Sequence, residues 1–240
     1  MSGRPLVGFC CPSDHTVFAG VADALKARGL SVAFYDPDEP VAEGTLRELD
    51  ALVVKKARPA SFVTLRRADS LGVPAWNDFF VYCLFGFRLT GLHALEAVGL
   101  RTPPVSFVPP AGEYVAKYLR SWDGVPRRNG DGDFYQPLLP TDGTDQKYYV
   151  VDDGGRIHVS VLETTSKLEA EKQVLGRLDA DPAVVASLRD LVGRTGARGL
   201  GVDIVLVDGE PVAVDVNPAP SFRGAGLDDA ITESVERLVR

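Results

Sequence analysis

Short apolar runs alternate with segments of helical periodicity over the first 80 residues. The runs PLVGFC, LSVAFYD, ALVVK and VPAWN are separated by stretches in which apolar residues recur every three to four positions. Strands that alternate with helices favour a parallel sheet with helices on its faces. We therefore expect residues 1–80 to form an N-terminal parallel α/β domain.

The pattern changes to hairpins and helices in residues 81–240. A helix is predicted over FRLTGLHALEAVGL, a hairpin turns at DDGG, and two helices are predicted within residues 166–194. A second apolar hairpin, residues 201–217, precedes an amphipathic C-terminal helix. The loop-forming run SWDGVPRRNGDGD interrupts this region. These elements predict an α+β domain behind the α/β domain, with a cleft between two unequal lobes.

Charge and composition exclude several classes of protein. A net charge of −7 argues against a protein that binds nucleic acid through phosphate contacts. No apolar run approaches the length of a membrane span, and the N-terminus lacks the apolar core of a secretory signal. The three cysteines have no metal-ligand spacing and fit a reducing compartment. We expect a cytoplasmic protein with neither nucleic-acid nor membrane partners.

The second hairpin contains three polar side chains that are costly to bury. Asp215 and Asn217 are two residues apart and share one face of a strand, whereas Asp203 lies on the partner strand. A strict two-residue turn would place Asp203 opposite Val214, and one extra residue, expected near the turn, places it opposite Asp215. If the three oxygens converge, they form a site that suits Mg²⁺. The alternative is that Asp215 and Asn217 only cap the turn before Pro218.

The segment RGLGVDIVLVDGEPVAVDVNPAPSFRG resembles the metal-binding hairpin of the ATP-grasp superfamily. That superfamily includes carboxylate–amine ligases such as the glutamate-adding ligases, and more distantly the inositol trisphosphate kinases. Its pattern is an Asp, then Glu-x-Asn about a dozen residues later, and here Asp215 stands in place of the more frequent Glu. The resemblance implies that Asp203, Asp215 and Asn217 bind Mg²⁺, or Mn²⁺, at the phosphates of ATP.

Other segments resemble the same superfamily in the same order over residues 77–240. The helix NDFFVYCLFGFRLTGLHALEAVGL has Arg88 at its basic position, and YVAKYLR resembles the strand whose lysine, here Lys117, touches the phosphates. FYQPLLP resembles the hinge that lines the adenine pocket, which implies roles for Gln136, Pro137 and Leu138. DQKYYVVDDG places Lys147 beside phosphate or substrate as a catalytic residue.

The lysines leave a structural alternative open. Lys117 alternates with apolar residues along its strand, so its side chain either points into a cleft or extends along the surface to solvent. Lys147 has the same ambiguity. Only 18 residues separate Lys117 from Gln136, fewer than in the superfamily's usual lid. The resemblance therefore implies an ATP-grasp fold over residues 81–240 with a shortened lid subdomain at about residues 112–140.

Three basic residues are candidates for substrate binding. Lys55 and Lys56 end a predicted strand, where ligands of open α/β sheets usually bind, although a solvated strand end is the simpler interpretation. Arg223 follows the metal-binding strand, where it would bind a substrate carboxylate or act catalytically on an acyl-phosphate.

The leading hypothesis is an ATP- and Mg²⁺-dependent ligase that joins a carboxylate to an amine through an acyl-phosphate. Its substrates would be small molecules or peptides, and the resemblance also allows a homodimer. One alternative is a kinase of a phosphorylated polyol, which the cluster of Lys55, Lys56 and Arg58 favours. The other is a non-catalytic nucleotide-binding protein, because a short lid shields ATP less well.

Overall fold

The N-terminal part of the protein is a parallel sheet. A computed structural model of the chain describes residues 4–166, 168 and 173–240. Its first sheet has the strand order β2-β1-β3-β4, and all pairs are parallel, as the alternation of strands and helices predicted. The strands are β1 (Leu6–Cys10), β2 (Ser31–Tyr35), β3 (Ala51–Val54) and β4 (Ala75–Trp76).

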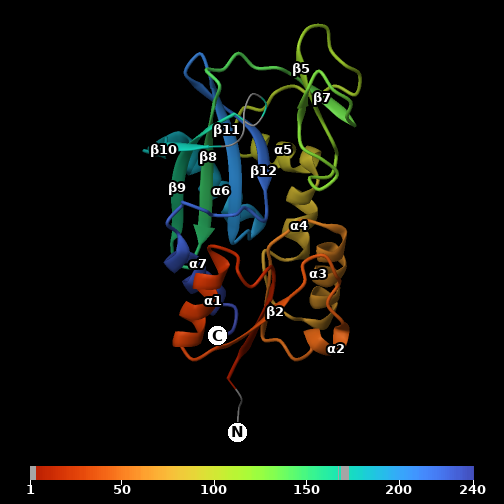
Figure 1. Cartoon of the computed structure of the whole chain (residues 1–240). Helices are drawn as coiled ribbons and strands as arrows, with labels where there is room; N and C mark the ends of the chain where they lie inside the picture. The colour runs from red at the N-terminus through yellow and green to blue at the C-terminus, as the bar shows by residue number, and fades with distance from the viewer. Residues whose placement is uncertain (1–3, 167, 169–172) are drawn as a thin grey trace.

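Helix α1 lies on one side of this sheet and helices α2 and α3 on the other (Figure 1). His15 lies just before the first helix, which begins at Phe18. Its Nδ1 accepts hydrogen bonds from the backbone N–H groups of Val17 and Phe18, at 3.3 Å each. The helices are α1 (Phe18–Ala27), α2 (Glu43–Leu46), α3 (Pro59–Leu71), α4 (Phe79–Gly86), α5 (Arg88–Glu96), α6 (Pro182–Thr195) and α7 (Asp228–Glu236).

A five-stranded antiparallel sheet forms the C-terminal part, with the strand order β10-β9-β8-β11-β12. Its strands are β8 (Thr144–Asp152), β9 (Ile157–Thr165), β10 (Val174–Leu178), β11 (Gly199–Val207) and β12 (Glu210–Asn217). The prediction of two helices within residues 166–194 is wrong in part. Residues 174–178 pair with β9 as an edge strand, α6 is a helix as expected, and residues 167 and 169–172 lie outside the described residues.

The segment 112–140, which we call the lid, is a small three-stranded sheet. Its strands β5 (Tyr114–Lys117), β6 (Arg127–Arg128) and β7 (Phe134–Pro137) pair in the order β6-β5-β7. No helix occurs between residues 112 and 140, all of which are described. The lid lies above the end of α5, at the top right of Figure 1.

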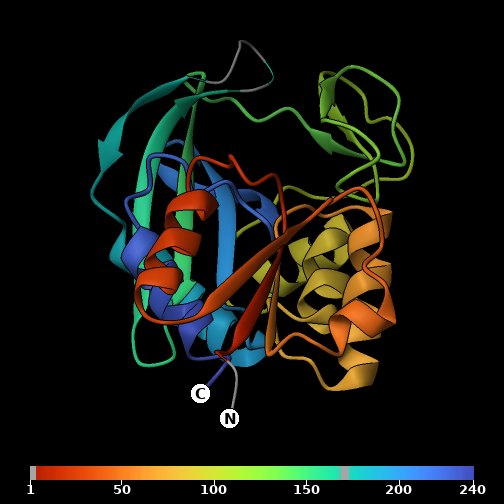
Figure 2. The ribbon, with the colours of Figure 1, turned by 60° about the horizontal axis from the view of Figure 1, so that its bottom comes forward.

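One hydrophobic core joins the two sheets. It contains Val7 and Phe9 of β1 together with Tyr149 of β8 and Ile231 of α7, and α1 packs beside α7 (Figure 2). The division of the chain at residue 80 therefore stays a prediction, because core packing crosses it. None of the described helices is long and apolar enough to cross a membrane.

Asn77 fixes the N-terminal sheet to the second hairpin. Its side chain is buried, with a backbone φ of 58°, a conformation that Asn tolerates better than most residues. Nδ2 donates to the carbonyl oxygens of Gly199 (2.5 Å) and Pro218 (2.7 Å), and Oδ1 accepts from the N–H of Arg198 (2.7 Å). One side chain thus makes hydrogen bonds both to the start of β11 and to the residue after β12.

Candidate functional site

A bulge in the β11–β12 hairpin brings the two acids opposite each other. The turn is the two-residue pair Asp208-Gly209, whose positive φ angles of 53° and 82° fit a type I′ hairpin. Ile204 still pairs with Ala213, but the next pair is Asp203 with Asp215, so Val214 is the extra residue. The extra residue that convergence required is present, in the middle of β12 instead of near the turn as we predicted.

The bulge also provides a partner for Lys117. A bulged residue leaves its backbone groups outside the regular ladder, and the carbonyl of Val214 accepts a 2.6 Å hydrogen bond from Nζ of Lys117. Lys117 is 5% exposed, so its side chain points inward and does not extend to solvent. Burial lowers the pKa of Lys117 to about 8, although the charges of Asp215 and Asp203 oppose this effect.

Lys147 is the partner of Asp203 across the sheet. The two residues face each other in the β8–β11 register, and Nζ of Lys147 lies 2.8 Å from Oδ1 of Asp203. Burial lowers the pKa of Lys147, but the charge of Asp203 and the hydrogen bond to it outweigh burial and raise the pKa above its ordinary value. Lys147 therefore remains a cation held at the acidic pair.

Arg88 connects Asp215 to the lid. Its side chain is 5% exposed, and its Nε lies 3.7 Å from Oδ1 of Asp215. The sequence indicated a basic position at Arg88 but gave no sign of these contacts, because they are made with a loop that has no regular pattern. The guanidinium donates to four carbonyl oxygens of that loop, those of Tyr118 (2.8 Å), Arg120 (3.1 Å), Ser121 (3.4 Å) and Gly124 (3.2 Å).

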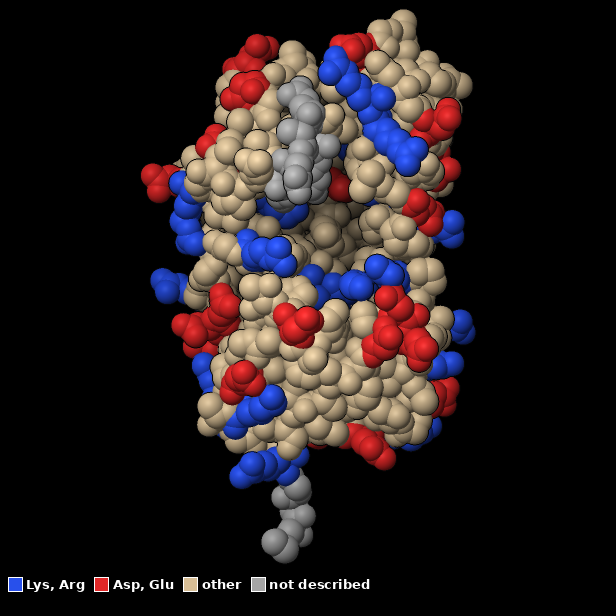
Figure 3. All heavy atoms as spheres, in the orientation of Figure 1, with Lys and Arg blue, Asp and Glu red and all other residues tan. Residues whose placement is uncertain are grey.

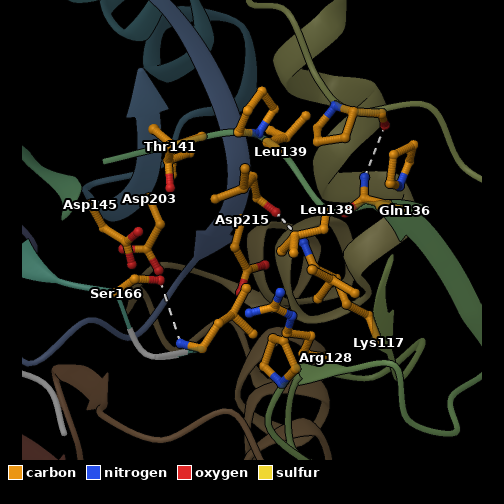
Figure 4. A pocket seen from close by; sticks show the side chains of 18 of the residues that line it. Lys117, Arg128, Gln136, Leu138, Leu139, Thr141, Asp145, Ser166, Asp203 and Asp215 are labelled. Atoms are coloured by element: carbon orange, nitrogen blue, oxygen red, sulfur yellow. Dashed lines mark hydrogen bonds between the residues drawn. The ribbon is translucent and has the colours of Figure 1, made fainter. Parts of the chain in front are cut away.

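The acids, the lid and the segment after β7 enclose a cleft of about 550 Å³, which we call the first cleft. Figure 4 shows Asp203 and Asp215 on one side and Gln136 and Leu138 on the other. Gln136 is 1% exposed and donates from Nε2 to the carbonyl of Pro103 at 2.9 Å, while its Oε1 has no partner among the described residues. Gln136 and the adjoining Pro137 and Leu138 thus line one wall of the cleft, and their role at an adenine stays a prediction.

The acidic pair fits a hard divalent cation. Mg²⁺ commonly takes one or two carboxylates from the protein and completes its shell with water and phosphate oxygens. Asp203 and Asp215 lie opposite each other and line the same cleft. Among the described residues there is no group of three or more His, Cys, Asp or Glu side chains, so most ligands of such an ion would come from solvent or nucleotide.

Asn217 lies apart from this cleft. Its Oδ1 accepts a 2.8 Å hydrogen bond from the N–H of Ala219, the turn-capping role that we kept as an alternative. An amide oxygen has a second lone pair, so this bond does not remove Asn217 as a ligand. Asn217 lines a neighbouring cleft, and its role at a metal stays a prediction.

This second cleft, of about 790 Å³, is basic. It lies where β1 and β3 end, and Figure 3 shows Lys and Arg side chains around the hollow in the middle of this face. None of the described residues that line it carries a carboxylate. The lining residues are Pro12, His15, Lys55, Lys56, Ala57, Arg58, Pro59, Ser121, Trp122, Lys147, Asn217, Ala219 and Ser221.

Two of the three predicted substrate residues line the second cleft. Lys55 is 5% exposed and donates from Nζ to the carbonyl of Ala219 at 2.6 Å, which excludes a solvated strand end for this residue. Lys56 lies nearer the surface, with Nζ 3.7 Å from Oδ2 of Asp38. Arg223 lines neither cleft: it is exposed and lies 3.4 Å from Oγ1 of Thr16. The preceding Phe222 buries its ring in the core, so the chain directs Arg223 outward.

Solved structures with the same arrangement of elements are ATP-grasp proteins. The chain is similar to the ATP-grasp ligase PsnB complexed with a minimal precursor, Mg and ADP (15% identity, TM-score 0.68, covering 100% of this chain and 99% of that one). It is also similar to the macrocyclase MdnC bound with the precursor peptide MdnA, from Microcystis aeruginosa (13%, 0.69, 98% and 100%). A third is a RimK domain ATP-grasp protein from Sphaerobacter thermophilus (18%, 0.72, 96% and 99%).

The chain therefore has the ATP-grasp fold, as the resemblance of its second hairpin implied. The likeness covers the whole chain, including the N-terminal sheet. No protein-family model matches the sequence, and a search of curated proteins gave no match.

Proposed function

We propose that the protein is an ATP- and Mg²⁺-dependent ligase that joins a carboxylate to an amine. One observation carries the proposal: the bulged hairpin presents two opposed carboxylates, flanked by the buried cations Lys117 and Lys147, to a cleft that the lid helps to enclose. The proposal is supported by the fold that the chain shares with PsnB and MdnC, whose structures are described as an ATP-grasp ligase and a macrocyclase.

In this proposal the first cleft binds the nucleotide. Pro137 and Leu138 contact the adenine, and Asp203 and Asp215 hold Mg²⁺. When bound, that ion neutralises phosphate charge and orients the γ-phosphate. Lys117 would give up its hydrogen bond to Val214 in favour of a phosphate oxygen, which restores a full opposite charge to a buried lysine.

The acceptor binds in the second cleft, and Lys147 lies between the two sites. Lys147 lines the second cleft and is bonded to Asp203 of the first. The acceptor carboxylate attacks the γ-phosphate to give an acyl-phosphate and ADP, and the amine then displaces phosphate. Lys147 would stabilise the charge on the transferred group, and the protein supplies no covalent nucleophile. Because Arg223 lines neither cleft, we assign it no step in this reaction.

A kinase is the second candidate, and the basic second cleft favours it. Lys55, Lys56 and Arg58 would suit an acceptor that is already phosphorylated. A nucleotide-binding protein without catalysis is the third, because the lid has no helix to shield ATP from water.

Phosphorus NMR separates the three functions. The protein is incubated with Mg·ATP and a pool of amino acids, di- and tricarboxylates and sugar phosphates, with Asp215→Asn as the matched control. The ligase predicts ADP and free phosphate, with a new amide product detected by mass spectrometry, whereas the kinase predicts ADP and a phosphate ester. If calorimetry shows that a nucleotide analogue binds but ATP is not turned over with any acceptor in the pool, both enzymatic functions are contradicted.

A further inference from the structure

The lining of the second cleft has an unusual charge balance for this protein. The chain as a whole carries a net charge of −7, yet the described residues that line the cleft include four basic side chains and no carboxylate. Lys147 already has Asp203 as its partner, and Lys56 and Arg58 share the exposed Asp38 at the mouth. Of the four basic residues in the described lining, Lys55 is the one that remains.

Lys55 lacks a carboxylate partner within the described part of the chain. Its side chain is 5% exposed, and its one hydrogen bond there is donated to the carbonyl of Ala219. A lysine ammonium has three N–H groups, so two remain for a ligand. Burial is the main reason why the pKa of Lys55 falls to about 7, and a buried cation of this kind is stabilised by an anion.

His15 adds a neutral donor to the same cleft. Its Nδ1 accepts hydrogen bonds from the backbone N–H groups of Val17 and Phe18. In a neutral imidazole the other nitrogen, Nε2, must then bear the hydrogen and act as a donor. Burial and the charges of Lys55 and Arg223 lower the pKa of His15, which favours this neutral form. The ring lines the cleft together with Lys55.

We propose that the acceptor carries a second oxyanion, a carboxylate or a phosphate, that binds to Lys55 and His15 with Lys56 at the mouth of the cleft. The group that reacts with ATP then lies near Lys147, and the second anion is held at the ends of β1 and β3. This inference rests on the proposed function, because it specifies the acceptor as at least dianionic.

Calorimetric titration without nucleotide or Mg²⁺ tests the second anion site by itself. The probes are inorganic phosphate and malonate, with acetate as the monoanionic control at equal ionic strength. We expect phosphate or malonate to bind at least tenfold more tightly than acetate. Tighter binding of phosphate would indicate a phosphorylated acceptor, and tighter binding of malonate a polycarboxylate. Equal affinities for all three probes would overturn the proposal.

Variants locate the binding. Lys55→Met should lower the affinity for the preferred probe at least tenfold, and Lys56→Met about threefold. Lys26→Met, at an exposed lysine of α1, should leave that affinity unchanged. Trp122 lines the cleft, whereas the other tryptophan, Trp76, is buried in the core. If the probe quenches tryptophan fluorescence in the wild type but not in Trp122→Phe, the probe binds in the cleft. If circular dichroism shows that Lys55→Met does not fold, the test rests on Lys56→Met and Trp122→Phe. Unchanged affinity in Lys56→Met together with unchanged fluorescence quenching in Trp122→Phe would refute the site.

The outcome is independent of ligase activity. Failure of the anion titration would leave turnover on a monoanionic acceptor intact, whereas absence of ATP turnover would leave the anion site intact.

Discussion

The buried lysines of the two clefts are neutralised in two different ways, and comparing the clefts shows where each still needs an anion. Lys147 lines the second cleft and is bonded to the carboxylate of Asp203 in the first, and its pKa is raised in spite of burial. Lys117 and Lys55, one in each cleft, each donate to a backbone carbonyl at 2.6 Å, and burial lowers the pKa of both. Lys147 belongs to a charge pair that is complete within the protein. The other two mark the places where a ligand must bring negative charge.

The largest expected effect concerns the acids that distinguish the first cleft. Asp215→Asn keeps the shape of the side chain but removes the charge opposite Asp203, so we expect at least about a hundredfold loss of Mg²⁺-dependent ATP turnover. Steady-state kinetics over a range of Mg²⁺ concentrations measures it. The binding of phosphate or malonate in the second cleft should be unchanged.

The same hairpin provides the control. Asp208→Asn makes the same chemical change at an exposed turn residue whose φ of 53° Asn accepts readily. Turnover should stay within twofold of the wild type. Equal losses in Asp215→Asn and Asp208→Asn would mean that overall charge, and not the acidic pair, is responsible.

Arg88 offers a smaller perturbation, directed at the link between Asp215 and the lid. Arg88→Met removes four hydrogen bonds to the loop 118–124 and the charge near Asp215, and we expect about tenfold weaker binding of a non-hydrolysable Mg·ATP analogue. Calorimetry measures the affinity, and Arg88→Lys should recover only part of it, because an ammonium lacks the guanidinium fork.

Arg66→Met, an exposed arginine of α3, is the matched control and should bind like the wild type. If Arg88→Met binds the analogue normally while remaining folded in urea titrations, Arg88 serves the architecture of the lid alone.

The smallest effect is a difference in how stability depends on pH. Because the pKa of Lys55 is about 7 in the folded protein and near 10.5 when unfolded, the unfolded state holds more protons between these values. Lys55 therefore makes the free energy of unfolding rise with pH, by roughly 1 kcal/mol per unit between pH 8 and 10. Urea unfolding at pH 7, 8 and 9 should show a shallower rise in Lys55→Met, and identical slopes would contradict the burial argument.

The parallel sheet and the acidic pair could be predicted because both depend on patterns within short segments of the sequence. Alternating strands and helices, and two acids twelve residues apart in an apolar hairpin, depend on side-chain period and little else. The short lid was also predicted correctly, because only 18 residues separate Lys117 from Gln136, fewer than in the superfamily's usual lid.

What the sequence did not predict depends on contacts between distant segments. The bulge at Val214 could not be placed, because Asp208-Gly209 is a good turn in either register. The contacts of Arg88 join residues at least 30 positions apart. Nor did the pattern predict that Asp215 and Asn217 would line different clefts. Asn217 accepts a hydrogen bond from the backbone of Ala219 and lines the second cleft, whereas Asp215 lines the first. The position of Arg223 outside both clefts follows from the burial of Phe222, which the local pattern did not indicate, and its role stays a prediction.

In most hairpins the turn both closes the chain and sets the register of the strands, but here the bulge at Val214 sets the register of the acids. Alignment of the acids is established midway along β12, so the tip of the hairpin has no part in it beyond closing the chain. Asp208-Gly209 can therefore be exchanged for another type I′ pair, or opened to receive a peptide tag, while the acids stay in register. Deleting Val214, or inserting one residue after it, would instead change both the pairing of the acids and the position of the carbonyl that Lys117 uses. Tolerance to engineering in this hairpin thus decreases from the tip toward the middle.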